Sequence, residues 1–216
     1  VTYHIKLAIA DFGPFGQDNA LDSAVFLKGG SFGIGNIELG DNLLEENGGA
    51  LCVGGTVELN SSLNPADYTF TWFLGDDQIP NATGATLVVS QEGEYTVQAV
   101  LNNSTCTGTD SVTVEFYAPV VPGTAQALAI CDSATTGIFN LTDNTAAITA
   151  PLGNNYTLTY FLTEQAAIDN IDGTDIDNPT AYTNISNPQT IYVRAQNNDT
   201  GCFGVTNFQL IINDLT

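Results

Sequence analysis

The sequence predicts an all-β chain made of two β-sandwiches in tandem, and two observations support that prediction. The first is an alternating strand at residues 68–74, where Tyr68, Phe70 and Trp72 share one face and Thr69, Thr71 and Phe73 lie on the other. This is the pattern of a strand with one buried side. A single large aromatic in mid-strand is typical of the core of an immunoglobulin-like sandwich. The second observation is that the same pattern recurs in the second half of the chain.

The repeat is visible strand by strand. The run Tyr-Thr-Phe-Thr-Trp-Phe-Leu at 68–74 returns as Tyr-Thr-Leu-Thr-Tyr-Phe-Leu at 156–162, with Tyr160 in the place of Trp72. A second strand, at 93–100, returns at a spacing of 96 residues (191 − 95), so that Tyr95, Val97, Ala99 and Cys106 match Ile191, Val193, Ala195 and Cys202. The spacing between matching residues differs from one strand to the next, while the residues within each strand stay aligned. This indicates duplication of one module with loops of different length.

Three domains follow from this reading. Residues 1–40 hold two apolar strands around a turn-rich loop, and two strands do not fold alone, so we expect the C-terminal strands of another β-rich domain. Residues 41–118 form the first whole sandwich and residues 119–216 the second. Two prolines in the segment 118–123 predict a short, stiff linker between them. In the second sandwich, Thr163 predicts the cap of one or two helical turns that begin at Glu164.

Four cysteines allow three pairings. The pairing in sequence order, Cys52–Cys106 and Cys131–Cys202, places one disulfide inside each sandwich, and we expect it. Such bonds require an oxidising compartment. Four reduced, buried thiols are the alternative.

The charge excludes several partners. With 3 Lys+Arg against 24 Asp+Glu, the net charge is −21, so the chain lacks the basic surface that nucleic acid or an anionic membrane requires. We expect no direct membrane insertion either. Charged residues are only 12% of the chain, which leaves a surface rich in Asn, Thr, Ser and Gly. This composition suits an exported β-rich protein.

The loop between the first two strands holds a candidate calcium site. Its residues Asp11, Asp18, Asn19 and Asp22 offer several oxygen ligands on one loop, as Ca²⁺ requires. Turn formation by the same side chains is the alternative. Calcium is the one cofactor that the sequence predicts.

The sequence predicts no catalysis. His4 is the only histidine, and there is neither a Ser-His-Asp arrangement nor an HExxH motif. The chain carries many Asp residues, but no carboxylate pair stands out as a glycosidase pair.

Several motifs resemble the modules of large surface proteins of Bacteroidota. Segments 3–11 and 22–32 resemble the C-terminal end of the choice-of-anchor L domain. The motifs Cys52-x-Gly-Gly and Gly93-x-Tyr-x-Val, together with Trp72, resemble PKD/immunoglobulin-like repeats. The stretch 190–195 with Gly201-Cys202 resembles the adhesin repeat of the same proteins.

The resemblance implies a non-catalytic, disulfide-stiffened stalk in a large adhesin on the outer face of the outer membrane. It implies export by type IX secretion and a part in adhesion or gliding motility. The partners would be surface polysaccharide or substratum, bound by other parts of the protein, and the secretion or motility machinery. It also favours calcium in the Asp11–Asp22 loop. Asp-Ser-apolar triplets match the O-glycosylation pattern of these bacteria at Ser23, Ser111 and Ser133.

A second function stays open at the level of the sequence. The segment could be a carbohydrate-binding module of a secreted polysaccharide-degrading protein. Exposed aromatics such as Phe73, Tyr117 or Tyr182 would then stack on sugar rings.

Overall fold

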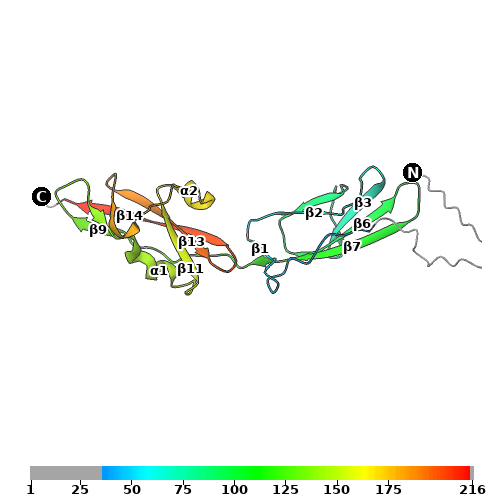
Figure 1. Ribbon diagram of the computed structural model, residues 1–216, viewed down its shortest axis with the longest axis horizontal. Helices are drawn as coiled ribbons and strands as arrows, with labels where there is room; N and C mark the ends of the chain where they lie inside the picture. The colour runs from blue at the N-terminus through cyan, green and yellow to red at the C-terminus, as the bar shows by residue number, and fades with distance from the viewer. Residues whose placement is uncertain (1–35, 215–216) are drawn as a thin grey trace, which may run out of the picture.

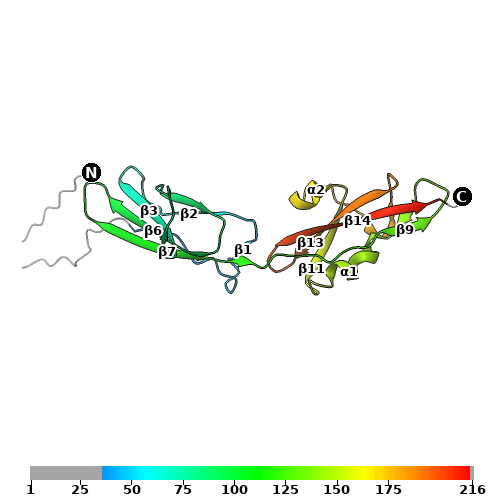
Figure 2. The ribbon, with the colours of Figure 1, turned by 180° about the vertical axis from the view of Figure 1, so that it is seen from behind.

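The computed structural model describes residues 36–214 and confirms the all-β prediction of two sandwiches in tandem. The two sandwiches lie end to end, with the described chain entering at one outer end and leaving at the other (Figure 1). The view from behind shows the same arrangement (Figure 2). The predicted strands before residue 36, the calcium loop and Ser23 lie outside the described residues.

The first sandwich packs a four-stranded sheet against a two-stranded one. The large sheet has the order β4-β3-β6-β7, and the small sheet pairs β2 with β5. A third pair, β1 with β8, runs parallel and joins the first strand to the last. The bounds are β1 Leu51–Cys52, β2 Val57–Asn60, β3 Tyr68–Leu74, β4 Asp77–Gln78, β5 Thr86–Val89, β6 Gly93–Leu101, β7 Thr107–Val114 and β8 Phe116–Tyr117.

The core of this sandwich lies on the face that the alternation predicted. Phe70 and Trp72 of β3 are fully buried, whereas Thr69, which lies on the opposite face of the strand, is exposed. The indole Nε1 of Trp72 donates a hydrogen bond of 2.9 Å to the carbonyl of Gly84. Tyr95 begins the buried face of β6, and its hydroxyl donates to the carbonyl of Gln91, 3.0 Å away. That contact ties the corner before β6 to the sheet, as a tyrosine corner does.

The second sandwich repeats the plan with small helices added. Its large sheet has the order β11-β13-β14-β9, and a short pair joins β10 with β12. β9 again runs parallel to the last strand. The bounds are β9 Leu128–Cys131, β10 Ile138–Phe139, η1 Leu141–Asn144, α1 Thr145–Thr149, β11 Tyr156–Phe161, α2 Glu164–Asp169, η2 Pro179–Ala181, β12 Tyr182–Thr183, β13 Gln189–Asn197 and β14 Phe203–Asn213.

The predicted helical turn is confirmed. The Thr163 hydroxyl accepts a hydrogen bond from the backbone N–H of Ala166, 3.2 Å away, which satisfies a donor that the first turn of α2 leaves free. At its other end, α2 stops at Asn170 in the left-handed conformation, where Asn is well tolerated.

Tyr160 takes the place of Trp72 in the second core but does not reproduce its hydrogen bond. Its hydroxyl is buried and, within the described residues, has no hydrogen-bond partner. Burial raises the pKa of the Tyr160 phenol, and the neighbouring Thr145 side chain opposes the shift without reaching hydrogen-bonding geometry. The duplicated cores have therefore diverged at the one position where each carries a polar aromatic.

We expect the two aromatic positions to respond oppositely to substitution by Phe. Trp72→Phe removes buried volume and leaves the Gly84 carbonyl unpaired, so the first sandwich should lose about 2 kcal/mol of unfolding free energy. Tyr160→Phe removes an unpartnered hydroxyl, so the second sandwich should be unchanged or gain about 1 kcal/mol. Denaturant unfolding followed by circular dichroism measures both. A comparable loss in the two variants would show that the Tyr160 hydroxyl is satisfied after all.

Candidate functional site: the joint between the sandwiches

A single disulfide joins the two sandwiches. Cys52 of β1 is bonded to Cys202, in the turn before β14, with a Cα–Cα distance of 5.3 Å and a sequence separation of 150 residues. Cys106 and Cys131 are free and exposed. The predicted pairing Cys52–Cys106 and Cys131–Cys202 is therefore wrong: the bond lies between the domains and not within each of them.

The fold itself rules out the pairing within a domain. Cys202 directly precedes β14, whereas Cys131 lies opposite Asn213 at the other end of that strand. Eleven residues of strand span about 36 Å, while the Cα atoms of a disulfide lie within about 7 Å of each other. In the first sandwich β7 and β8 separate Cys106 from Cys52 in the same way, because Cys52 lies opposite Tyr117.

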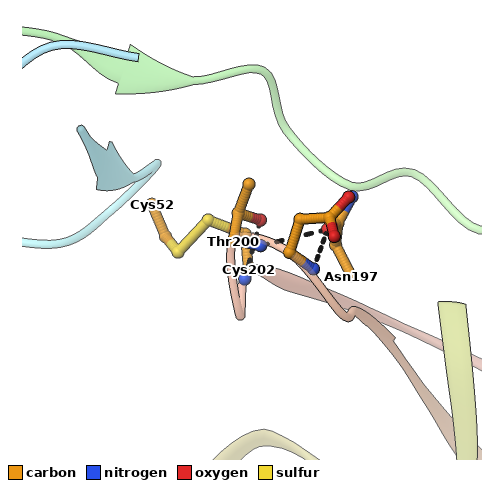
Figure 3. The surroundings of a disulfide bond; sticks show 5 residues. Cys52, Asn197, Thr200 and Cys202 are labelled. Atoms are coloured by element: carbon orange, nitrogen blue, oxygen red, sulfur yellow. Dashed lines mark hydrogen bonds between the residues drawn. A yellow bond between two sulfur atoms is a disulfide. The ribbon is translucent and has the colours of Figure 1, made fainter. Parts of the chain in front are cut away.

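The turn that presents Cys202 is held by local hydrogen bonds (Figure 3). The Asn197 side-chain oxygen accepts from the N–H groups of Asp199 and Thr200, at 2.9 and 3.1 Å. The Thr200 hydroxyl accepts from the N–H of Cys202, 3.2 Å away, and the Cys202 carbonyl accepts from the N–H of Asn197 at 2.8 Å. Cys202 is only 4% exposed. These hydrogen bonds fix the backbone of the turn that carries the Cys202 sulfur.

The linker chain lies against the second sandwich at the same place. A Cβ on Gly204 would fall 2.1 Å from the carbonyl oxygen of Val120, so only glycine allows the linker to pack on the start of β14. Farther along, the N–H of Gly123 donates to the carbonyl of Ile148 in α1, at 2.8 Å. Since β8 ends at Tyr117, the segment between the two sandwiches is reduced to Ala118 and Pro119.

Two covalent paths therefore cross the joint side by side. One is the chain at Ala118-Pro119 and the other is the disulfide. A connection at one point alone would leave the two domains free to rotate relative to each other. Between them lies a small cavity of about 110 Å³. Its lining consists of residues from both sandwiches and the linker: Cys52, Val53, Ala118, Pro119, Val120, Cys202 and Phe203.

Arg194 supports the joint from the side of the second sandwich. Its guanidinium carbon lies 3.3 Å from the centre of the Phe203 ring, directly next to Cys202. Its Nη1 donates to the carbonyls of Ala167 and Ile168, at 3.0 and 2.8 Å, in the last turn of α2. Burial lowers the pKa of Arg194. A buried cation on helix-end carbonyls and an aromatic face is a structural contact, so these contacts give Arg194 a packing role at the joint.

The other predicted sites are not brought together. Asp11, Asp18, Asn19 and Asp22 lie outside the described residues, so calcium stays a prediction. Ser111 and Ser133 are both exposed, and their glycosylation stays a prediction too. Within residues 36–214, no three acidic, histidine or cysteine side chains meet as metal ligands, and no helix there is long and apolar enough to cross a membrane.

The aromatics that the carbohydrate-binding alternative required do not form a platform. Phe73, Tyr117 and Tyr182 are each half-buried and lie on strands of three different sheets. The Tyr182 hydroxyl is also engaged, because it accepts a hydrogen bond of 2.7 Å from the Gln189 side chain. Nothing in the described residues favours sugar stacking.

Three family models match successive parts of the chain. Residues 1–33 match the choice-of-anchor L domain, residues 44–116 match the PKD domain, and residues 127–216 match the Flavobacterium inter-domain disulphide bond domain. Each covers less than half of the chain. Together they fit a non-catalytic segment of a secreted or cell-surface protein of Bacteroidota type, with immunoglobulin-like repeats and a disulfide between domains. No curated protein matches the chain in sequence.

The solved structures to which the chain is similar are distant. An I-band fragment of titin, I67–I69, is 13% identical, with a TM-score of 0.30 over 74% of this chain and 60% of that one. The three N-terminal domains of the highly immunogenic outer capsid protein of bacteriophage RB49 are 14% identical, with a TM-score of 0.30 over 76% of this chain and 56% of that one. Domains 3–5 of Drosophila OTK are 11% identical, with a TM-score of 0.26 over 83% of this chain and 65% of that one.

We expect the substitution Cys52→Ser to loosen the joint and to leave both sandwiches folded. The strand content by circular dichroism should be unchanged, while small-angle X-ray scattering should show a wider distribution of interdomain distances. The chain-entropy model gives the lost bond about 5 kcal/mol for a loop of 150 residues, if both sandwiches unfold together. The matched control is Cys131→Ser, which removes a free thiol and should change neither measurement. Identical scattering from Cys52→Ser and the parent protein would mean that packing alone fixes the joint.

Proposed function

We propose that this chain is a force-transmitting stalk segment of a large cell-surface adhesin of Bacteroidota, exported by type IX secretion and used in adhesion or gliding. The family matches support the coarse class of the protein. The position of the disulfide at a two-residue joint supports the mechanical role. A calcium ion on Asp11, Asp18, Asn19 and Asp22 belongs to the same proposal, as a stiffening element before the first sandwich.

The disulfide changes the path that a pulling force takes. The described chain enters and leaves at opposite outer ends of the tandem (Figure 1). Tension between those ends reaches Cys52 and Cys202 and then crosses the sulfur–sulfur bond, because that is the shortest covalent route. Residues 53–201 lie inside the covalent loop. They include every strand from β2 to β13, so these strands can unfold without lengthening the stalk.

The charge suits the same role. A net charge of −21 keeps neighbouring copies apart on a crowded surface, because like charges repel over the Debye length of about 8–10 Å in physiological salt. The disulfide itself requires an oxidising compartment. The disulfide therefore supports a position outside the cytoplasm.

Single-molecule force spectroscopy tests the mechanical proposal. The oxidised protein, held by its two ends, should release only the contour length that lies outside the Cys52–Cys202 loop. Cys52→Ser should release more by the length of the enclosed chain, and 150 residues at about 3.3–3.6 Å each give roughly 500 Å. The control variant Cys106→Ser keeps the bond and should extend no farther than the parent.

An oxidised protein that extends as far as its Cys52→Ser variant would refute this role. That result would mean that the force bypasses the bond or that the bond does not form.

Attachment under flow tests the cellular proposal. Cells that lack the protein should detach from a surface at lower shear than the parent strain, and cells that make the Cys52→Ser protein should show an intermediate loss with equal amounts of protein on the surface. Protease treatment of intact cells measures the surface amount. Unchanged attachment of the deletion strain would exclude a role in adhesion, whatever the force measurements show.

A further inference from the structure

A turn at residues 44–49 leads the incoming chain into β1, and it contains the dipeptide Asn47-Gly48. No other asparagine in the sequence is followed by glycine. This dipeptide is the one most easily deamidated, because glycine has no side chain to hinder attack of its backbone nitrogen on the preceding carboxamide. Both residues are exposed, so water reaches them.

The backbone of the turn holds the attacking nitrogen in a hydrogen bond. The N–H of Gly48 donates to the carbonyl of Glu45 at 3.1 Å, and the N–H of Gly49 donates to the carbonyl of Leu44 at 3.0 Å. Gly48 has a φ of 75°, and this pair of bonds around a left-handed glycine is a Schellman motif. In the closed turn the Gly48 nitrogen is therefore engaged with Glu45.

The Asn47 carboxamide is held in three further hydrogen bonds. Its Oδ1 accepts from the N–H groups of Leu44 and Gly49, at 3.2 and 2.8 Å. Its Nδ2 donates to the carbonyl of Asn42 at 2.8 Å. A Cβ on Gly49 would fall 2.8 Å from Asn47 Oδ1, so glycine there lets the carboxamide lie against the chain. These three bonds, the Asn47 latch, keep the turn closed.

Two contacts fasten the same turn to the end of β7. The N–H of Thr113 donates to the Asn42 side-chain oxygen at 2.8 Å. The N–H of Glu45 donates to the Glu115 carboxylate at 2.7 Å. All of these contacts lie at the surface, so the turn can open locally while the core of the sandwich stays folded.

We propose that Asn47 is a deamidation site whose reaction rate is set by opening of this turn, and that the reaction prevents the turn from closing again. The residue that holds the turn closed is thus the residue that is lost when the turn stays open. The conversion is a one-way loosening of the attachment between the incoming chain and β7.

The chemistry needs only water. The Gly48 nitrogen bonds to Cγ of Asn47, the Cγ–Nδ2 bond breaks, and the amide proton of Gly48 leaves with the amino group as ammonia. The product is a cyclic imide. Water then adds to one of its two carbonyls, which gives either aspartate or isoaspartate at position 47.

Neither product can rebuild the Asn47 latch. Aspartate lacks the Nδ2 donor, so its carboxylate would face the carbonyl of Asn42. Isoaspartate adds an atom to the backbone of the turn and so breaks its register. The new negative charge also adjoins Glu46, which lines one surface hollow together with Glu45 and Glu115, and like charges repel.

The turn lies where tension would reach it. Residues 36–51 precede Cys52 and stay outside the loop that the disulfide closes. A pulling force on the entry end therefore loads this turn, whereas residues 53–201 are bypassed. Only this link to load rests on the proposed function. Deamidation of Asn47 does not, so the two can fail separately.

Deamidation rates without load test the proposal. The intact protein is incubated at neutral pH, either folded or unfolded in guanidinium chloride. Chymotrypsin, which cuts after Leu44 and Leu51, releases the Asn47 peptide. Mass spectrometry detects the exchange of NH2 for OH, and enzymatic methylation detects isoaspartate. Conversion should be about tenfold slower or more in the folded protein, because several hydrogen bonds must break first. Equal rates in the two states would overturn the proposal.

Variants that loosen the turn should speed the reaction in the folded protein. Asn42→Ala removes the bond to Thr113, and Glu115→Ala removes the acceptor for Glu45. Each should raise the rate about fivefold, the equivalent of one hydrogen bond. The matched control is Asn102→Ala, which removes side-chain hydrogen bonds from another turn of the same sandwich and should leave the rate unchanged. An unchanged rate in both loosened variants would show that turn opening does not control the reaction.

Hydrogen exchange tests the effect of the product. In Asn47→Asp the N–H groups of Leu44 and Gly49 should exchange about fivefold faster than in the parent protein, because one bond of the latch is lost. Asn154→Asp adds the same charge at an exposed position of the second sandwich and should leave both N–H groups protected. Full protection in Asn47→Asp would mean that the turn closes without the carboxamide, which would refute the one-way loosening.

Discussion

The structure depends on where each sandwich places its two cysteines. The first strand runs parallel to the last strand and ends beside it, at the exit end of the domain. The strand that leads to that end, β7 in the first sandwich and β14 in the second, begins at the opposite end, directly after the turn that carries the second cysteine. One cysteine therefore lies at each end of every module, about 30 Å or more apart. Such a pair cannot close on itself, whereas Cys52 of the first sandwich and Cys202 of the second meet where the two stack end to end.

Apart from the disulfide, the joint between the stacked sandwiches consists of a very short linker. Only Ala118 and Pro119 separate the end of β8 from the linker residues that pack on the second sandwich, where Gly204 lets the Val120 carbonyl approach. Proline fixes one backbone angle of this segment, and the disulfide adds a second attachment beside it. Two attachments remove most of the bending freedom that one leaves. Arg194 holds Phe203 and the end of α2 together behind the bond, so the cysteine is anchored in the body of its domain.

The sequence was sufficient for the strands and insufficient for the bond. Alternation around Trp72 and the repeat at Tyr160 predicted the buried faces, because strand periodicity is a local property. The pairing was chosen by assuming one bridge in each domain, and topology contradicts that assumption. A signal was available: Cys106 and Cys202 both end a turn, and Cys52 and Cys131 both end a first strand. The approach of Val120 to Gly204 and the contacts of Arg194 depend on packing between distant segments. No local sequence pattern encodes such packing.

The duplicated modules show which features the arrangement requires. Their cores have drifted: Tyr160 replaces Trp72 without its hydrogen bond, and Ile191 replaces Tyr95 and so loses the tyrosine corner. The turns have drifted as well: three hydrogen bonds around Cys106 repeat those around Cys202, but the left-handed residue is Asn103 in one turn and Gly201 in the other. A turn that closes a hairpin can use any of several geometries. What the two turns share is the place of the cysteine, directly before β7 and β14, and at the joint that place is what the bond with Cys52 requires.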